Sequence, residues 1–546
     1  MRRLWLSFGL LAVGAGMLAG ARLAGAADGV GFRQGGIFRV GFTGASVQID
    51  PQLAYVSTAW WLEYATAAKL VNYQDRSGQA GTRLVPELAS RYTVSRDGRT
   101  WTFFIRKGFR FSDGLPVMAA SFKHAIDRVA NHDLASPGAQ FITDSNGTNI
   151  VGAREVSDGR SQHVRGVVVK GNRLIVHLTR RDPAFLSKLA MPFFQATSAR
   201  LPLNREVTSA YPSAGPYFFR RNKLNEVTQL RRNPYYRGAR THNLRGLDLR
   251  WNLNEESAYR QVLAGGLDEG PLPTDHVQEV AKTFGVNKTR FWKKPTSCLS
   301  FLAINDDRPL FRNNVALRRA LSWVVNRKAY AGAPGPYAMT PWSHLLPPTS
   351  PGSVTARKLQ PYRGAPNLRK ARRLAAGHLR RGRINIGYRS SGALGTPQAR
   401  LLRADLVKLG VDPTRIKLKG YSGADIYDAM GKRNTDLDLG VGMGWCADTS
   451  PMDPASLVRQ ALESSSFFGI DSAKYTRRLE AALRLNGEAR YRALGKVDVD
   501  LMSDLVPTVV LSVYNNRYFF SSRVDPGSLL YHNVYVDWSI PRLALK

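Results

Sequence analysis

Long apolar runs are almost absent from this 546-residue chain. The apolar run near its beginning, residues 4–18, is too short for an ordinary membrane-spanning helix, and no later stretch approaches the roughly 20 residues that a span needs. Low-complexity tracts are absent too, and 43% of the residues are hydrophobic. The composition is that of a globular protein, and this length predicts two or three lobes rather than one core.

Residues 1–26 differ from the rest of the chain. Arg2 and Arg3 precede the apolar run, and the small residues 24–26 supply a cleavage site. This arrangement is typical of a secretory signal peptide. Because no Cys stands at the cleavage site, we expect an exported protein, periplasmic or extracellular, that is not lipid-anchored through an N-terminal Cys.

Acidic residues are few: 41 Asp and Glu stand against 78 Lys and Arg, which gives a formal charge of +37. Removal of residues 1–26 takes away three arginines and no acid, and lowers this charge to +34. Such an excess of positive charge is typical of proteins that bind nucleic acid. The basic residues are spread through the chain, however, and export separates it from nucleic acid. We therefore expect no nucleic-acid binding, and attraction to anionic lipid or cell-wall polymer instead.

Only two cysteines are present, Cys298 and Cys446. An exported protein meets an oxidising compartment, which permits a disulfide between them. Two buried free thiols are the alternative on this evidence.

Motifs of catalysis and metal binding are missing. The chain has no Gly-x-Ser-x-Gly elbow, no His-Glu-x-x-His pair and no phosphate-cradling loop. Its nine histidines are scattered without metal-ligand spacing. We therefore expect a protein that is not an enzyme and that holds no metal or cofactor.

The first half of the chain contains two hairpin patterns. Residues 92–94 and 101–105 flank a Ser-Arg-Asp-Gly turn, and residues 167–169 and 174–176 flank Lys-Gly-Asn-Arg. Apolar spacing predicts a helix over residues 119–129.

The second half alternates strand and helix patterns, which favours an α/β lobe over about residues 300–500. Residues 298–305 predict a strand, and residues 316–329 and 401–409 predict helices. Residues 332–361 are rich in Pro, Gly and Ser, and predict a long surface connection.

Residues 439–454 predict a short buried strand that runs into a turn. Trp445, Cys446 and Asp448 follow one another closely at the end of this strand. A carboxylate that leaves a buried strand needs a cation or several donors. The partner of Asp448 is either a neighbouring Arg or backbone amides, or the ammonium of a ligand that stacks beside Trp445.

Residues 85–116 carry Pro-Glu-Leu-Ala followed by Ser-Asp-Gly-Leu-Pro. In this order the two motifs resemble the N-terminal block of the family 5 extracellular solute-binding proteins of ABC importers. The Ser-Ala-Gly-Pro-Tyr of residues 213–217, the Arg-Asn-Pro-Tyr-Tyr of 232–236 and the Gly-Leu-Asp of 266–268 are similar to later family motifs. The resemblance covers about residues 36–525.

This resemblance implies an α/β fold of the type II periplasmic-binding-protein kind, with two lobes, three subdomains, mixed sheets, a hinge and a ligand cleft between the lobes. The binding protein would then comprise residues 27–546. Lobe I would take about residues 27–300 and 500–546, with an inserted subdomain at about 60–200, and lobe II about residues 301–499.

Cys298 and the Gly-Trp-Cys-Ala-Asp of residues 444–448 resemble the oligopeptide-binding branch of this family. In that branch the two cysteines form a disulfide and the Asp takes the α-ammonium of the bound peptide. The resemblance therefore implies that Cys298 pairs with Cys446 and that Asp448 is the ligand anchor. It assigns four residues to the ligand: Trp445, Cys446, Ala447 and Asp448.

We therefore expect the substrate-binding component of an ABC importer, which captures a peptide-like solute as a monomer by lobe closure and delivers it to the permease subunits in the membrane. The Thr-Ser-Pro-Met-Asp-Pro of residues 449–454 departs from the branch's Tyr-Asn-Glu-Pro, so ligand length and chemistry stay open. One alternative is a receptor for another small solute, such as a metal chelate, an opine or a sugar. The other is a basic envelope-associated protein without transport.

Overall fold

The computed structural model describes residues 35–143, 149–423, 425–432, 434–446, 454–463 and 469–546. The predicted signal peptide and the site residues Ala447 and Asp448 lie outside the described residues. Among the described helices, none is long and apolar enough to cross a membrane.

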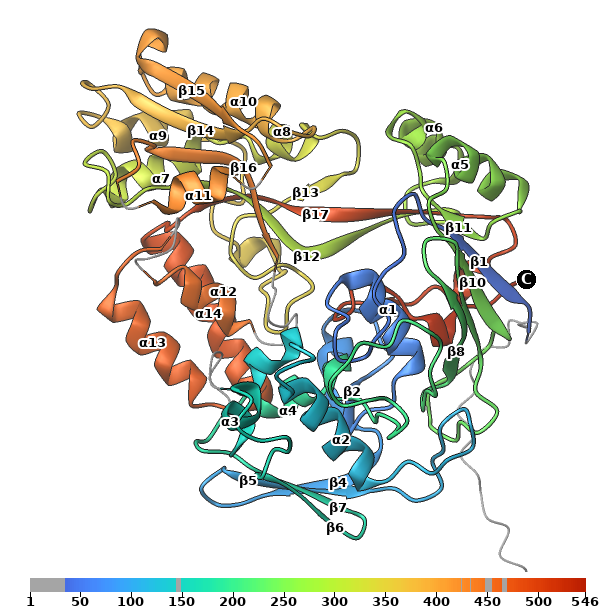
Figure 1. Cartoon of the computed structure of the whole chain (residues 1–546). Helices are drawn as coiled ribbons and strands as arrows, with labels where there is room; N and C mark the ends of the chain where they lie inside the picture. Colours follow the sequence, from blue (N-terminus) through green and yellow to red (C-terminus); the bar gives the residue numbers. More distant parts are fainter. Residues whose placement is uncertain (1–34, 144–148, 424, 433, 447–453, 464–468) are drawn as a thin grey trace, which may run out of the picture. The chain divides into compact units, whose positions relative to one another are not determined.

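One large mixed sheet runs through the described chain (Figure 1). Its strands are β1 (Ile37–Gly41), β8 (Tyr217–Lys223), β9 (Val227–Arg232), β10 (Gly246–Arg250), β11 (Glu269–Gly270), β12 (Phe291–Ile304), β13 (Met339–Pro341), β14 (Ile384–Arg389), β15 (Ile416–Tyr421), β16 (Leu439–Cys446) and β17 (Val509–Phe520). They lie in the order β15-β14-β16-β12-β17-β11-β1-β10-β9-β8, and β13 pairs with β17. The pairs of β1 with β10 and β11, and of β14 with β15 and β16, are parallel, and the other pairs are antiparallel.

The long strands β12 and β17 connect the two ends of this sheet. β12 pairs with β16 from Cys298 onward and with β17 on its other edge, while the far end of β17 pairs with β11. The beginning of β17 is apolar and buried on both faces, as in a strand covered by helices on both sides. Residues 292–295 of β12 and 514–517 of β17 are only half-buried. The two strands are therefore least covered where they pass between the two ends of the sheet.

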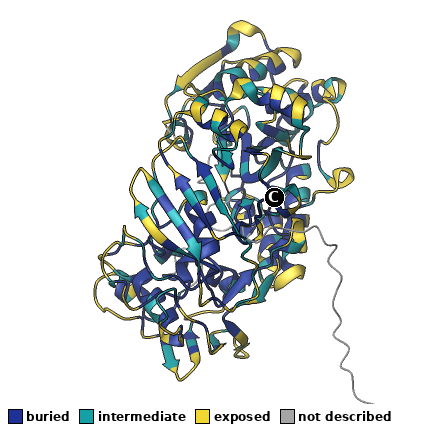
Figure 2. Cartoon of the chain, turned by 90° about the vertical axis from the view of Figure 1, so that its right-hand side faces the viewer, coloured by how far each residue is buried: buried dark blue, intermediate teal, exposed yellow. Residues whose placement is uncertain are grey.

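Alternate residues of β12 point into different cores, as the two-residue period of a strand requires. Leu299 and Phe301 belong to one hydrophobic cluster, together with residues of the helices at 455–460, 473–483 and 487–504. Leu302 and Ile304 belong to another, with residues of the helices at 315–324, 368–375 and 395–408. Figure 2 shows buried residues along the strands and exposed residues on the outer turns of helices and on loops.

The fourteen described helices are α1 (Ser57–Thr66), α2 (Ala119–Ala130), α3 (Ala153–Ser157), α4 (Phe185–Leu189), α5 (Glu255–Ala264), α6 (Val277–Phe284), α7 (Val315–Val324), α8 (Arg327–Gly332), α9 (Leu368–Ala375), α10 (Gly395–Lys408), α11 (Asp425–Gly431), α12 (Ala455–Gln460), α13 (Ala473–Leu483) and α14 (Gly487–Asp504). The predicted helices at 119–129 and 401–409 are confirmed as α2 and α10. The helix predicted over 316–329 is two helices, because Val325 is extended and the side chain of Asn326 accepts the Ala329 N–H and starts α8.

A smaller antiparallel sheet follows the order β4-β5-β7-β6. Its strands are β4 (Ala89–Val94), β5 (Thr100–Ile105), β6 (Val167–Lys170) and β7 (Arg173–His177), so both predicted hairpins are confirmed. Two short pairs complete the strands: β2 (Val71–Tyr73) with β3 (Leu84–Pro86), and β18 (Tyr531–His532) with β19 (Asp537–Trp538).

The surface connection predicted over residues 332–361 is wrong for the middle of that segment. Leu345 and Leu346 are buried in a hydrophobic cluster. Their N–H groups donate to the carboxylate of Asp498 in α14 at 2.8 and 3.0 Å, and His344 Nδ1 lies 2.6 Å from the same carboxylate. The segment can be buried because this carboxylate satisfies backbone groups that would otherwise need water.

Candidate functional site

The end of β16 is covalently joined to β12. Cys298 and Cys446 lie directly opposite each other in the antiparallel pair, with Cα atoms 3.9 Å apart, and form a disulfide. The bridge implied by the resemblance is therefore present, and the alternative of two free thiols is excluded. It fixes the position at which the chain leaves β16.

A bulge in β16 precedes the disulfide. The register with β12 shifts between Phe301 and Ala303, where β16 has one extra residue. Gly442 there has a φ of 74°, and a Cβ at this position would lie 2.5 Å from the Cα of Gly395. Only glycine can both adopt this backbone conformation and leave room for Gly395 so close by. Such a bulge bends a strand and redirects the residues that follow it, here Gly444 to Cys446.

One edge of β16 is open beyond the bulge. Pairing with β14 ends at Val441, and no described strand continues along that edge. The Tyr427 hydroxyl of α11 takes the place of a strand: it donates to the Gly444 carbonyl and accepts the Gly444 N–H, both at 2.8 Å. One side-chain hydroxyl therefore satisfies both backbone groups of Gly444.

Tyr514 of β17 reaches the same glycine. A Cβ on Gly444 would lie 3.0 Å from the Tyr514 hydroxyl. Burial raises the pKa of Tyr514 and the neighbouring Tyr427 raises it further, while the charge of Arg389 acts in the opposite direction. The Tyr514 hydroxyl therefore keeps its proton at neutral pH and remains a donor. Arg389, at the end of β14, is exposed, and its Nε lies 3.4 Å from the Ser391 hydroxyl.

The structure locates two of the four predicted ligand residues. Trp445 is half-buried and packs in part against the cluster that contains Leu299, and Cys446 is exposed. Ala447 and Asp448 lie outside the described residues, so the ligand roles of all four residues stay predictions.

Sequence reasoning did not identify Tyr427, Arg389 or Tyr514 as residues of this site. Tyr427 lies in a helix and Arg389 at the end of a different strand, and no spacing in the sequence connects either to Gly444. The only local signal was the glycine-rich strand itself, since a strand without side chains on one face admits close neighbours.

Two half-buried acids lie near the other end of the crossing strands. Burial raises the pKa of Glu269 in β11 well above its usual value, and the charge of Asp537 in β19 raises it further. Burial also raises the pKa of Asp537, to about 7. Across the described chain, no three His, Cys, Asp or Glu side chains are grouped to hold a metal ion.

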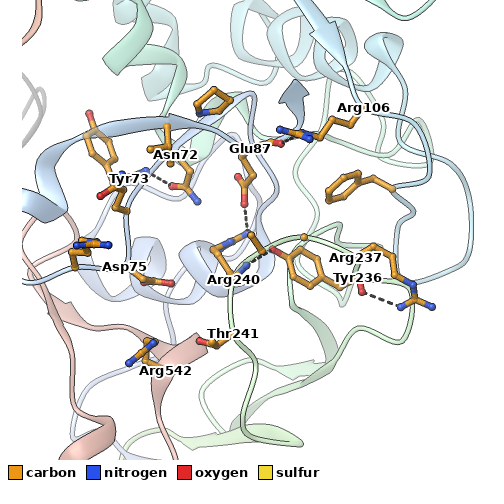
Figure 3. Close-up of a pocket in the computed structure, with 17 residues that line it drawn as sticks. Asn72, Tyr73, Asp75, Glu87, Arg106, Tyr236, Arg237, Arg240, Thr241 and Arg542 are labelled. Atoms are coloured by element: carbon orange, nitrogen blue, oxygen red, sulfur yellow. Dashed lines mark hydrogen bonds and ion pairs between the residues drawn. The ribbon is translucent and has the colours of Figure 1, made fainter. Parts of the chain in front are cut away.

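A cavity of about 700 Å³ lies apart from β16, between β2, β3 and residues 236–241 (Figure 3). Arg240 on its wall donates to the carbonyls of Tyr64 and Ala67 near the end of α1, and its Nη2 lies 2.8 Å from the carboxylate of Glu87. The fold thus supplies both the acceptors and the counter-charge of this arginine.

The chain belongs to a family of solute-binding proteins. Residues 83–466 match the family described as bacterial extracellular solute-binding proteins, family 5 Middle. This family is one of non-catalytic proteins, in agreement with the absence of catalytic motifs from the sequence.

Curated relatives are about a quarter identical to this chain over the residues that align. Identity is 25% over 446 residues with the heme-binding protein A of Haemophilus influenzae, which covers 79% of this chain and 78% of that protein. It is 24% over 440 residues with the periplasmic oligopeptide-binding protein OppA of Escherichia coli, covering 76% and 77%. A probable ABC transporter-binding protein of Deinococcus radiodurans is 26% identical over 296 residues, 48% of this chain and 47% of that protein. The chain thus spans about half the length of the first curated relatives that it matches.

Solved structures share the fold. The unliganded open form of the periplasmic murein tripeptide-binding protein MppA matches 94% of this chain and 98% of its own, with a TM-score of 0.79 and 20% identity. The expected mixed α/β fold of the periplasmic peptide-binding proteins is therefore confirmed.

Proposed function

We propose that the protein is the exported substrate-binding component of an ABC importer and that it captures a peptide-like solute. Its family supports a solute receptor, and relatives named for oligopeptides and tripeptides support a peptide. The protein acts as a monomer outside the cytoplasm. It delivers its ligand to permease subunits in the membrane.

The open edge of β16 is the observation that carries the peptide proposal. The N–H and C=O of Gly444 point away from β12 and, among the described residues, are bound only by the hydroxyl of Tyr427. An extended peptide can add along such an edge and take both hydrogen bonds with its own backbone. Backbone bonds are the same for every sequence, so this edge binds peptides with little regard to their side chains.

Charged groups near this edge would fix the direction of the peptide. Asp448 follows Cys446 by two residues, and we assign it to the ligand ammonium, with Trp445 against the ligand. Arg389 is the exposed cation beside the tyrosines, and we assign it to a ligand carboxylate.

Closure of two lobes would bury the peptide against this edge. We place lobe I at about residues 27–300 and 500–546, with an inserted subdomain at about 60–200, and lobe II at about 301–499. The crossing strands β12 and β17 belong to both lobes and are half-buried at 292–295 and 514–517, where a hinge has the fewest contacts to break.

Binding of peptides with a free and with a blocked amino terminus tests the assignment of Asp448 to the ligand ammonium. Asp448→Ala should weaken a tripeptide with a free amino terminus by about tenfold or more, because a charged hydrogen bond is lost, and should hardly affect the N-acetylated tripeptide. Calorimetric titration measures both affinities. Asp133→Ala, which removes an exposed acid with no ion pair among the described residues, is the charge-matched control. Equal weakening of both peptides by Asp448→Ala would contradict the assignment.

The hydroxyl of Tyr427 tests the edge independently. Tyr427→Phe leaves the N–H and C=O of Gly444 without a hydrogen-bond partner in the free protein, which costs roughly 1–3 kcal/mol of stability. If a bound peptide takes the place of the hydroxyl, the peptide satisfies both groups again. The variant should unfold more easily without ligand and bind peptide more tightly. Weaker binding by Tyr427→Phe would show that the hydroxyl contacts the ligand instead of giving way to it.

A further inference from the structure

A second cavity, of about 620 Å³, lies on the opposite edge of this part of the sheet. It is formed by the beginning of α8, the residues around Trp342 after β13, and residues 357–366. Thr340, Val513, Leu299 and Trp445 are register partners on the neighbouring strands β13, β17, β12 and β16. Three strand spacings, roughly 14 Å, therefore separate β13 from the β16 edge, so the cavity is a separate site.

The wall of this cavity carries positive charge only. Its residues include Arg327, Lys328, Arg357 and Arg363, and no Asp or Glu. Within the described part of the chain, none of these four side chains has an acidic partner within ion-pair distance, whereas many other arginines of the protein do. The cavity is therefore cationic beyond what the basic composition alone imposes.

Arg327 is bound by neutral groups of the fold and by no acidic side chain among the described residues. Its Nε donates to the carbonyls of Trp342 and Val510 at 3.1 and 2.8 Å, and its Nη1 donates to the carbonyl of Ser322 at 3.1 Å. Its Nη2 is buried and has no hydrogen-bond partner among the described residues. Neutral carbonyls hold this guanidinium in place, but none of them neutralises its charge.

The cavity of Figure 3 provides the contrast. There Arg240 is also held by backbone carbonyls, but the carboxylate of Glu87 lies 2.8 Å from it, and Asp75 adds a second acid to the wall. A guanidinium with a buried Nη2 and without such a partner is costly, and an anion that enters the cavity removes the cost.

The volume of the cavity and the apolar part of its wall indicate which class of anion it can bind. Small-molecule sites usually have volumes of roughly 300–1,000 Å³, so this cavity exceeds the needs of one inorganic ion. Trp342 and Tyr362 contribute aromatic surface to the wall. We propose that this cavity binds a small organic oxyanion, a carboxylate or a phosphate ester. Lys328, Arg357 and Arg363 at the rim pair with its negative charge, and the positive charge of Arg327 attracts it further.

Titration of the full chain with citrate and with glucose 6-phosphate, at constant ionic strength, tests this proposal. The test variant is Arg357→Gln/Arg363→Gln, in which both exposed rim cations lose their charge. The matched control is Arg76→Gln/Arg542→Gln, which removes two exposed arginines from the rim of the cavity in Figure 3 and changes the net charge equally. Because all four side chains are exposed, we expect both variants to keep the thermal midpoint of the original protein.

We expect saturable binding of at least one probe, with one site per chain, in the original protein and in the control. The test variant should bind that probe at least about tenfold more weakly, because hydrogen bonds from two charged groups are lost. The probe that binds more tightly identifies the carboxylate or the phosphate class. Absence of saturable binding by both probes, or equal weakening by the two double variants, would overturn the proposal. The outcome is independent of peptide binding at β16.

Discussion

The disulfide between β12 and β16 should be a major source of stability in this protein. Cys298 and Cys446 are 148 residues apart in sequence, and the bridge removes the freedom of that whole loop from the unfolded chain. The chain-entropy treatment gives about 5 kcal/mol for a loop of this length, and measured effects are typically about 2–4 kcal/mol. The β-ladder pairs Leu299 with Trp445 beside the bridge, so Cys298→Ser/Cys446→Ser removes the covalent bond and leaves the pairing possible.

Urea unfolding of the oxidised protein, the reduced protein and the double serine variant measures this contribution. We expect the free energy of unfolding to fall by about 2–5 kcal/mol, and by the same amount in the reduced protein and the variant. Reductant should not change the variant, which controls for other effects of the reagent. Hydrogen exchange should rise in peptides that contain 439–446 and stay low in the four-stranded sheet. Equal unfolding of the oxidised and reduced proteins would refute the reasoning.

Three further predictions concern buried charges. Asp498→Ala should lower the free energy of unfolding by about 3–5 kcal/mol, measured in urea, because His344 and two backbone N–H groups lose their acceptor; an effect below about 1 kcal/mol would contradict this. Arg128→Ala should have an effect of similar size, since it leaves the fully buried Asp50 without its ion pair, and unchanged stability would argue against that pair. Burial raises the pKa of Asp537 from 3.8 to about 7, so the unfolded state loses this proton at a lower pH than the folded state does. The stability of the fold should therefore fall as the pH rises from about 4 to about 7. Asp537→Asn should flatten this fall in thermal unfolding scans, and an unchanged pH profile would contradict the raised pKa.

Local patterns and motif order predicted much of the fold. The hairpins at β4–β5 and β6–β7 depend on neighbouring residues, and the turn residues between them are sufficient signals. The break at Asn326 was missed because no Pro or Gly stands between residues 315 and 331 to mark it, and only the cap at Asn326 separates the two helices. The segment 332–361 was misjudged from its composition, because its burial depends on Asp498, which is more than 130 residues away along the chain.

The candidate site was predictable only along the strand that carries its motif. The Gly-Trp-Cys pattern identified the end of β16 and the disulfide through the resemblance. The contacts of Tyr427, Tyr514 and Arg389 around Gly444 arise from the packing of a helix and two other strands, which no local pattern encodes. The cationic cavity beside Trp342 was equally invisible, since Arg327 and Arg363 resemble the many other arginines of a basic chain.

Native mass spectrometry of the protein purified from its own host, without unfolding, tests the central proposal most directly. A receptor that closes over its ligand retains it, so we predict a heterogeneous set of bound masses that release short peptides on denaturation. The masses would also give the preferred peptide length. A single discrete non-peptide mass, such as a heme or a metal chelate, would contradict the peptide proposal, although the receptor fold and the family would stand.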